Sequence, residues 1–62
     1  MSADEFKNLT ESDKGRQVKF QSPDTKPEFG EVSSWNDTFV FVRFGDNVAG
    51  HACSPEFVTF QS

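Results

Sequence analysis

The sequence predicts a small all-β domain, and three observations lead to this fold class. The chain has only 62 residues, near the size at which one apolar core is just sufficient, so we expect one domain at most. Its apolar residues are mainly eight Phe and six Val, with one Leu and no Ile, a composition that favours strands over a helical bundle. Turn-forming residues recur at close spacing, which is the pattern of a small sandwich or barrel.

Residues 1–13 differ from the rest and are expected to form a short helix or a flexible acidic tail. This segment holds four acidic side chains and one Lys, a local charge of −3. Ser2 and Glu5 have the spacing of a capping box, which predicts a helix start. Phe6 and Leu9 then fall on one face, and so short a helix persists only if that face docks.

The predicted β domain comprises residues 14–62 and begins with two strands. Residues 16–20 alternate polar and apolar side chains, as a half-buried strand does, and the two prolines within 22–27 mark a loop after it. A second strand is expected at 29–35. Within it, Gly30 indicates either a bulge or a close approach of two backbones.

Residues 38–44 form the strongest predicted strand of the chain. The Asn-Asp pair at 36–37 predicts a tight hairpin turn before it, and residues 45–47 predict a turn after it. A short fourth strand is expected at 50–53.

The C-terminal end is expected to form a 3₁₀ turn and a last short strand. Ser54 and Pro55 have the order of a helix start, Ser as the cap and Pro in the first position. Too few residues follow for a helix, so one 3₁₀ turn is expected before a strand at 57–60.

Two sequence stretches carry a resemblance to known small barrels. FGEV at 29–32 followed by FVRFG at 41–45 looks like the glycine–valine and V-x-F pattern of KOW- and Tudor-type domains. With its five strands and 3₁₀ turn, the chain resembles an SH3-like small barrel. Residues 30–60 are also similar to small uncharacterised proteins of enterobacterial phages and prophages. The resemblance implies an accessory protein in the cytoplasm of a bacterial host and implies no activity.

Arg43 decides which side of strand 38–44 faces solvent, because burying an unpaired guanidinium is very costly. Since side chains alternate along a strand, Phe39 and Phe41 share the side of Arg43. The alternate residues then point into the core: Val40, Val42 and Phe44.

Two registers of the central hairpin are open. A three-residue loop places Glu31 opposite Arg43, and it also places Trp35 opposite Phe39. A two-residue loop shifts the pairing by one residue and turns the valines outward. We favour the first register because it pairs opposite charges.

In the favoured register, aromatic rings gather beside the ion pair on the outer face. These are the candidate partner-binding residues: Trp35, Phe39, Phe41, Arg43 and Glu31. An exposed patch of aromatics with Arg is typical of a binding hot spot. Two other outcomes stay open: Phe6 and Leu9 cover the patch, or the patch joins two copies of the chain.

Other site chemistries find little support in the residues. One Cys and one His cannot build a structural zinc site, and the chain has no Gly-rich phosphate cradle, so no metal or cofactor is expected. Cys53 and His51 share one side of their strand but lack a third catalytic group. We interpret Cys53 as a core residue and His51 as a surface residue, with no catalytic residue in the chain. No apolar run approaches the ~18 residues of a membrane span.

The sequence therefore predicts a small non-enzymatic module that binds a protein partner, as a monomer or weak homodimer. The alternative is a nucleic-acid-binding barrel that stacks bases on its aromatic rings. The net charge of −4 disfavours it, because phosphate contacts need a basic surface. A third interpretation, in which the acidic segment 1–13 mimics DNA or blocks a host protein, also stays open.

Overall fold

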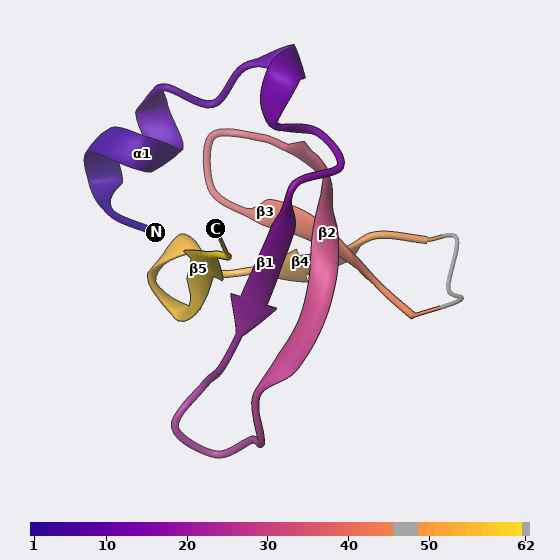
Figure 1. The fold of residues 1–62 in the computed structure, drawn as a ribbon. Coiled ribbons are helices and arrows are strands. Elements are labelled where there is room, and N and C mark those ends of the chain that lie inside the picture. Colours follow the sequence, from indigo (N-terminus) through magenta and orange to yellow (C-terminus); the bar gives the residue numbers. More distant parts are fainter. Residues whose placement is uncertain (46–48, 62) are drawn as a thin grey trace.

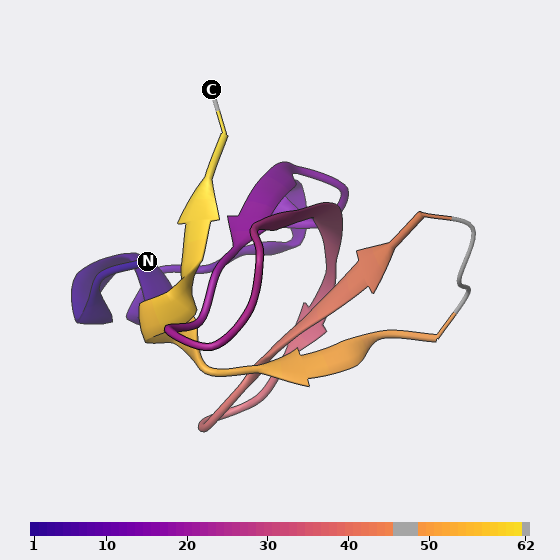
Figure 2. The same ribbon diagram turned by 90° about the horizontal axis from the view of Figure 1, so that it is seen from below.

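The computed structural model describes residues 1–45 and 49–61. In this part of the chain, five strands form one antiparallel sheet in the order β4-β3-β2-β1-β5, which confirms the mostly-β class. The elements in chain order are α1 (Ala3–Lys7), η1 (Glu11–Asp13), β1 (Gln17–Phe20), β2 (Glu28–Trp35), β3 (Val40–Phe44), β4 (His51–Cys53), η2 (Pro55–Phe57) and β5 (Val58–Phe60) (Figure 1). The sheet is strongly twisted, and in Figure 2 the β3–β4 hairpin runs across the view while β5 stands upright.

The core is built almost entirely of valine, and every strand contributes to it. Its buried members are Val18, Val32, Val40, Val42, Val58 and Cys53. Four phenylalanines lie around this centre and are only partly buried, because a sheet this small leaves no room for a ring at its middle: Phe6, Phe20, Phe44 and Phe60. The predicted alternation along β3 is confirmed, since Val40 and Val42 are buried and Phe44 packs against the core.

Gly30 lies at the middle of the sheet, where β2 pairs with both of its neighbours. It is opposite Val18 on β1 and opposite Phe44 on β3. A Cβ at this position would lie 2.5 Å from the backbone oxygen of Arg43. Of the two interpretations of Gly30, the close backbone approach is therefore the correct one.

The central hairpin has one predicted pair and one irregularity. Glu31 lies opposite Arg43, as the charges indicated. The register then shifts between Val32 and Ser34, which is a β-bulge in β2. The extra residue is Ser33.

Because of this bulge, the predicted pairing of Trp35 with Phe39 is wrong: Trp35 lies opposite Val40 instead. The loop is correspondingly longer and is closed by Asn36, whose side-chain oxygen accepts hydrogen bonds from the backbone N–H groups of Thr38 and Phe39, both at 2.7 Å. This use of an Asn side chain in a turn agrees with the turn predicted at 36–37.

The N-terminal segment forms the predicted capped helix. In α1 the Ser2 hydroxyl accepts from the Glu5 N–H at 3.1 Å, and the Glu5 carboxylate accepts from the Ser2 N–H at 2.8 Å. Phe6 and Leu9 pack against the core, so the expected apolar face of the segment is docked. No helix in the described residues is long and apolar enough to cross a membrane.

The end of the chain matches the expected order of elements with one difference in capping. The 3₁₀ turn η2 begins at Pro55, as predicted. The side chain of Ser54 makes no capping hydrogen bond, contrary to expectation, and its backbone oxygen accepts from the Phe57 N–H at 3.0 Å instead. The turn predicted at 45–47 includes Asp46 and Asn47, which lie outside the described residues.

Candidate functional site

Four of the five predicted binding residues lie on or beside the outer face of the central hairpin. Arg43 donates from Nη2 to Oε1 of Glu31 at 2.9 Å, and both side chains are a little under half exposed, at 41% and 44%. Phe41 is half-buried on β3, and Phe39 is exposed in the loop. Because both side chains are partly exposed, the ion pair is accessible to a partner. An ion pair at this exposure contributes little to the stability of the fold.

Trp35 does not belong to this outer face, which corrects the predicted aromatic patch. The bulge in β2 places it opposite the buried Val40, and its ring packs against the core. Lys14 Nζ lies 5.8 Å from the centre of its ring. The α1 residues Phe6 and Lys7 border a small hollow with Trp35, so the N-terminal segment lies beside this residue.

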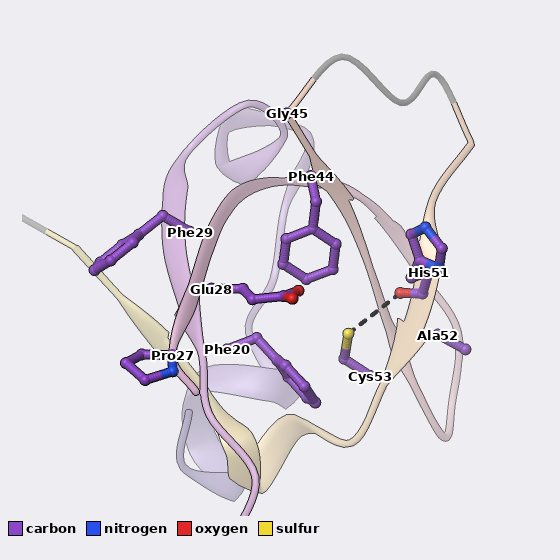
Figure 3. Close-up of a pocket in the computed structure, with 9 residues that line it drawn as sticks. All are labelled: Phe20, Pro27, Glu28, Phe29, Phe44, Gly45, His51, Ala52 and Cys53. Carbon is purple, nitrogen blue, oxygen red and sulfur yellow. Dashed lines mark hydrogen bonds between the residues drawn. The ribbon is translucent and has the colours of Figure 1, made fainter. Parts of the chain in front are cut away.

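A larger open groove lies at the other end of β2, on the concave side of the twisted sheet, and has a volume of about 750 Å³ (Figure 3). We call it the aromatic groove. Four strands line it: β1 through Phe20, β2 through Glu28 and Phe29, β3 through Phe44, and β4 through His51, Ala52 and Cys53. Pro27 and Gly45 complete its border.

Aromatic rings form a connected row in the aromatic groove. The ring centres of Phe20 and Phe44 are 6.2 Å apart in an edge-to-face arrangement, and those of Phe44 and His51 are 5.8 Å apart. Outside the groove lining, the ring centre of Phe57 lies 6.3 Å from that of Phe20. Such pairs hold one another in position, so the groove presents preset ring surfaces to a ligand.

The aromatic groove also contains a carboxylate and a thiol. Glu28 is exposed at the border, whereas Cys53 is only 4% exposed and its thiol donates to the backbone oxygen of His51 at 3.4 Å (Figure 3). Burial, with a smaller contribution from the charge of Glu28, raises the pKa of the Cys53 thiol. The thiol is therefore protonated at neutral pH and is a poor nucleophile, in keeping with its expected place in the core.

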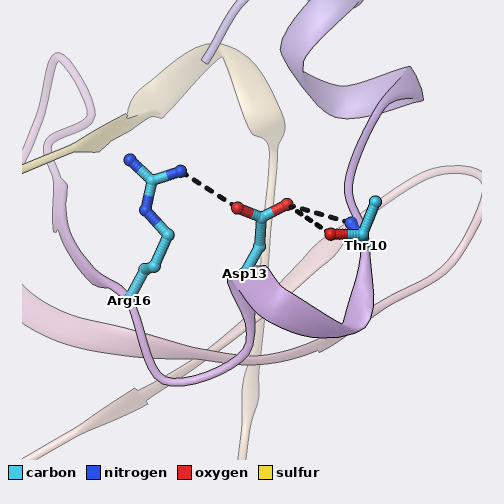
Figure 4. Close-up of polar contacts among 3 residues, drawn as sticks. All are labelled: Thr10, Asp13 and Arg16. Carbon is cyan, nitrogen blue, oxygen red and sulfur yellow. Dashed lines mark hydrogen bonds and ion pairs between the residues drawn. The ribbon is translucent and has the colours of Figure 1, made fainter.

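A second polar cluster attaches the N-terminal segment to the sheet. Asp13 accepts from the Thr10 N–H at 2.9 Å and from Arg16 Nη1 at 3.0 Å (Figure 4). These hydrogen bonds, that from Thr10 first, lower the pKa of the Asp13 carboxyl. The Arg16 guanidinium also lies 3.9 Å from the ring centre of Phe60. The cluster therefore links the segment after α1 to the residues that begin the sheet.

Within residues 1–45 and 49–61, no group of three or more His, Cys, Asp and Glu side chains is placed to hold a metal ion. The residues of the aromatic groove were not among the predicted site residues. One sequence signal for the groove is the loop of two prolines after the first strand, which folds the start of β2 back against β1 and sets Glu28 opposite Phe20. The other is the shared side of His51 and Cys53, which the sequence did not connect with a binding surface.

No family model matches this chain, and neither a curated protein nor a solved structure matches it. The functional assignment therefore depends on the chemistry of the two surfaces described above.

Proposed function

We propose that this protein is a small non-enzymatic interaction module that binds a segment of a protein partner in the aromatic groove. The observation that carries this proposal is the connected row of Phe20, Phe44 and His51 rings in an open groove of about 750 Å³. Concave, mostly apolar sites with a few polar groups are where ligands bind, and aromatic residues are enriched in binding hot spots.

The outer face supports the same proposal, because the two surfaces adjoin at Phe29. This residue is 63% exposed and borders both the aromatic groove and a shallow depression that includes Glu31 and Arg43. A partner seated in the groove would therefore extend over Phe29 onto the ion pair. Phe41 lies further along the same face.

A peptide selection against the full chain tests the proposal. Peptides enriched from a random library are titrated against the labelled protein by NMR, and we expect the amide signals of Phe44, His51 and Cys53 to shift. Phe29→Ala should weaken these peptides roughly tenfold, as expected for a contact worth about 1–2 kcal/mol. The proposal fails if no peptide is enriched, or if the shifts lie elsewhere.

Phe39→Ala is the matched control, since Phe39 is the other exposed phenylalanine and lies in the hairpin loop. We expect it to leave peptide affinity unchanged. If Phe39→Ala removes binding while Phe29→Ala does not, the outer face of the hairpin is the binding surface and the aromatic groove is not.

We also propose that the sheet curves into an SH3-like small barrel that stays open between its edge strands β4 and β5. The pairing of β1 with both β2 and β5 supports this curvature, as does the short turn η2 that joins β4 to β5 (Figure 2). We expect nuclear Overhauser contacts between the core side chains of Cys53 in β4 and Val58 in β5, and their absence would contradict the barrel. The role of a phage or prophage accessory protein in the bacterial cytoplasm is proposed from the sequence resemblance alone.

A further inference from the structure

We infer that the partner segment is an extended strand that pairs with the free edge of β4 and places one basic side chain in the aromatic groove. The inference rests on the proposed function, because it names how the groove is filled and by what chemistry.

Strand β4 offers an edge that is open to pairing. It is the first strand of the sheet order and pairs with β3 on one side, in a continuous register from Val42–His51 to Val40–Cys53. Natural edge strands are protected by a lysine, a proline or a bulge, or by being very short. Strand β4, with the sequence His-Ala-Cys and its unbroken register, has no lysine, proline or bulge, and its length of three residues limits an added strand to a short pairing.

The aromatic groove runs along this edge. All three residues of β4 line it, although side chains alternate between the two faces of a strand. Ala52 is opposite Phe41, so its methyl group is on the outer face with that ring, and Ala52 nevertheless borders the groove. A strand added here would direct alternate side chains into the groove, which is how strand addition obtains its specificity.

The lining of the groove favours a cation. Among the described residues that line it, Glu28 is the only carboxylate, and the rings of Phe20, Phe44 and His51 surround the remaining space (Figure 3). A guanidinium or ammonium group is attracted both to a carboxylate and to the face of an aromatic ring, while its methylene groups lie along apolar surface. The net charge of −4 on the whole chain further favours a basic partner.

Three peptides separate the elements of this inference on the full-length chain. The parent probe is acetyl-Thr-Val-Arg-Val-Thr-amide, and we expect it to shift the amide signals of His51, Ala52 and Cys53. Replacing its Arg by citrulline keeps the shape and removes the charge, and should lower affinity roughly fivefold to thirtyfold. Two N-methylated versions block alternate backbone N–H groups, and only one should lose binding, because only alternate groups face β4.

Two variants of the protein complete the test. Glu28→Gln should weaken the Arg peptide by a similar factor and leave the citrulline peptide unchanged. Glu56→Gln, an exposed carboxylate in η2 outside the groove lining, should leave both peptides unchanged.

Each failure has its own meaning. Equal binding of the Arg and citrulline peptides would contradict the claim that a basic side chain fills the groove. Equal binding of both N-methylated versions would contradict the claim that the peptide pairs with β4 as a strand. If no designed peptide binds while library-selected peptides still shift the groove signals, the inference is wrong and the proposed function stands. If neither kind binds, both are wrong.

Discussion

The two ends of β2 differ in what covers them, although both are built from aromatic residues around the same valine core. At the Trp35 end, α1 places Phe6 beside Trp35, and both Phe6 and Leu9 of the N-terminal segment pack against the core. At the Glu28 end, the rings of Phe20 and His51 border an open groove. An aromatic side chain is therefore structural at one end and available to a ligand at the other. Residue type alone does not distinguish the two roles.

The covered end depends on a segment that the local sequence organises well. The capping box holds the first turn of α1, and Asp13 ties the following turn to Arg16 at the start of the sheet (Figures 1 and 4). The open end is bordered by Pro27, which stiffens the loop before β2 and makes no backbone hydrogen bond through its nitrogen. We expect the covered end to contribute more to stability and the open end more to binding.

Gly30 lies in β2 between the two ends, and its substitution should cause the largest loss in the free energy of unfolding. A methyl group in Gly30→Ala would meet the backbone of Arg43 and the side chain of Phe44, neither of which can move without disturbing the sheet. We expect a loss of about 3 kcal/mol or more in the free energy of unfolding, enough to unfold a domain of this size. Circular dichroism during urea denaturation measures it.

Gly15→Ala is the comparator for Gly30→Ala. Gly15 has a φ of +89°, and nothing lies within 4 Å of a Cβ placed there. Gly15→Ala should lower the free energy of unfolding only because alanine disfavours a positive φ, by about 1–2 kcal/mol. Equal losses in the two variants would show that the close approach of β2 to β3 is not tight.

A pair of phenylalanine substitutions tests the two ends directly. Phe6→Ala removes a ring packed against the core and should lower the free energy of unfolding by about 1–3 kcal/mol. Phe29→Ala removes a ring that is 63% exposed and should change it by no more than about 0.5 kcal/mol. Urea midpoints measured side by side decide the comparison. A larger loss of unfolding free energy in Phe29→Ala than in Phe6→Ala would mean that the groove end contributes more to stability than the covered end.

The sequence predicts those parts of the hairpin that depend on neighbouring residues. The pairing of Glu31 with Arg43 follows from their charges, and the burial of Val40 and Val42 follows from alternation around Arg43. The position of Trp35 does not follow, because the bulge inserts one residue and turns every later side chain of β2 to the other face. No special residue type marks Ser33 as the bulge.

The aromatic groove is harder to predict than the hairpin, for a different reason. Its residues come from separate strands, and Phe20 and Cys53 meet only because the sheet twists back on itself. The twist depends on the packing of the whole sheet and has no local sequence signal. The outer face could therefore be found from the alternation of one strand, whereas the groove required the complete sheet order.

At alkaline pH, the free energy of unfolding should depend on Cys53, which lies at the open end of β2. The pKa of the Cys53 thiol is raised by burial above its ordinary value near 9.0. The unfolded chain then loses its thiol proton at lower pH than the folded chain, so stability is constant below that ordinary value and falls as pH rises through the raised pKa. The slope is at most about 1.4 kcal/mol per pH unit. In Cys53→Ala, the urea midpoint should not show this fall with pH. An unchanged fall would contradict its assignment to the Cys53 thiol.

At acid pH, the free energy of unfolding should depend on Asp13, which belongs to the segment at the covered end. This is the smallest effect that we expect. Hydrogen bonds from Thr10 and Arg16 lower the pKa of the Asp13 carboxyl below its ordinary value of 3.8, so the stability it contributes is present above that value and lost as pH falls through the lowered pKa. In Asp13→Asn, the fall in urea midpoint below about pH 4 should be shallower than in the unchanged chain. Glu11→Gln is the control, because the Glu11–Lys14 pair is solvent-exposed and contributes little. If Glu11→Gln and Asp13→Asn flatten the acid limb equally, general repulsion in the acidic segment explains the effect, and the Asp13 cluster does not hold the covered end closed.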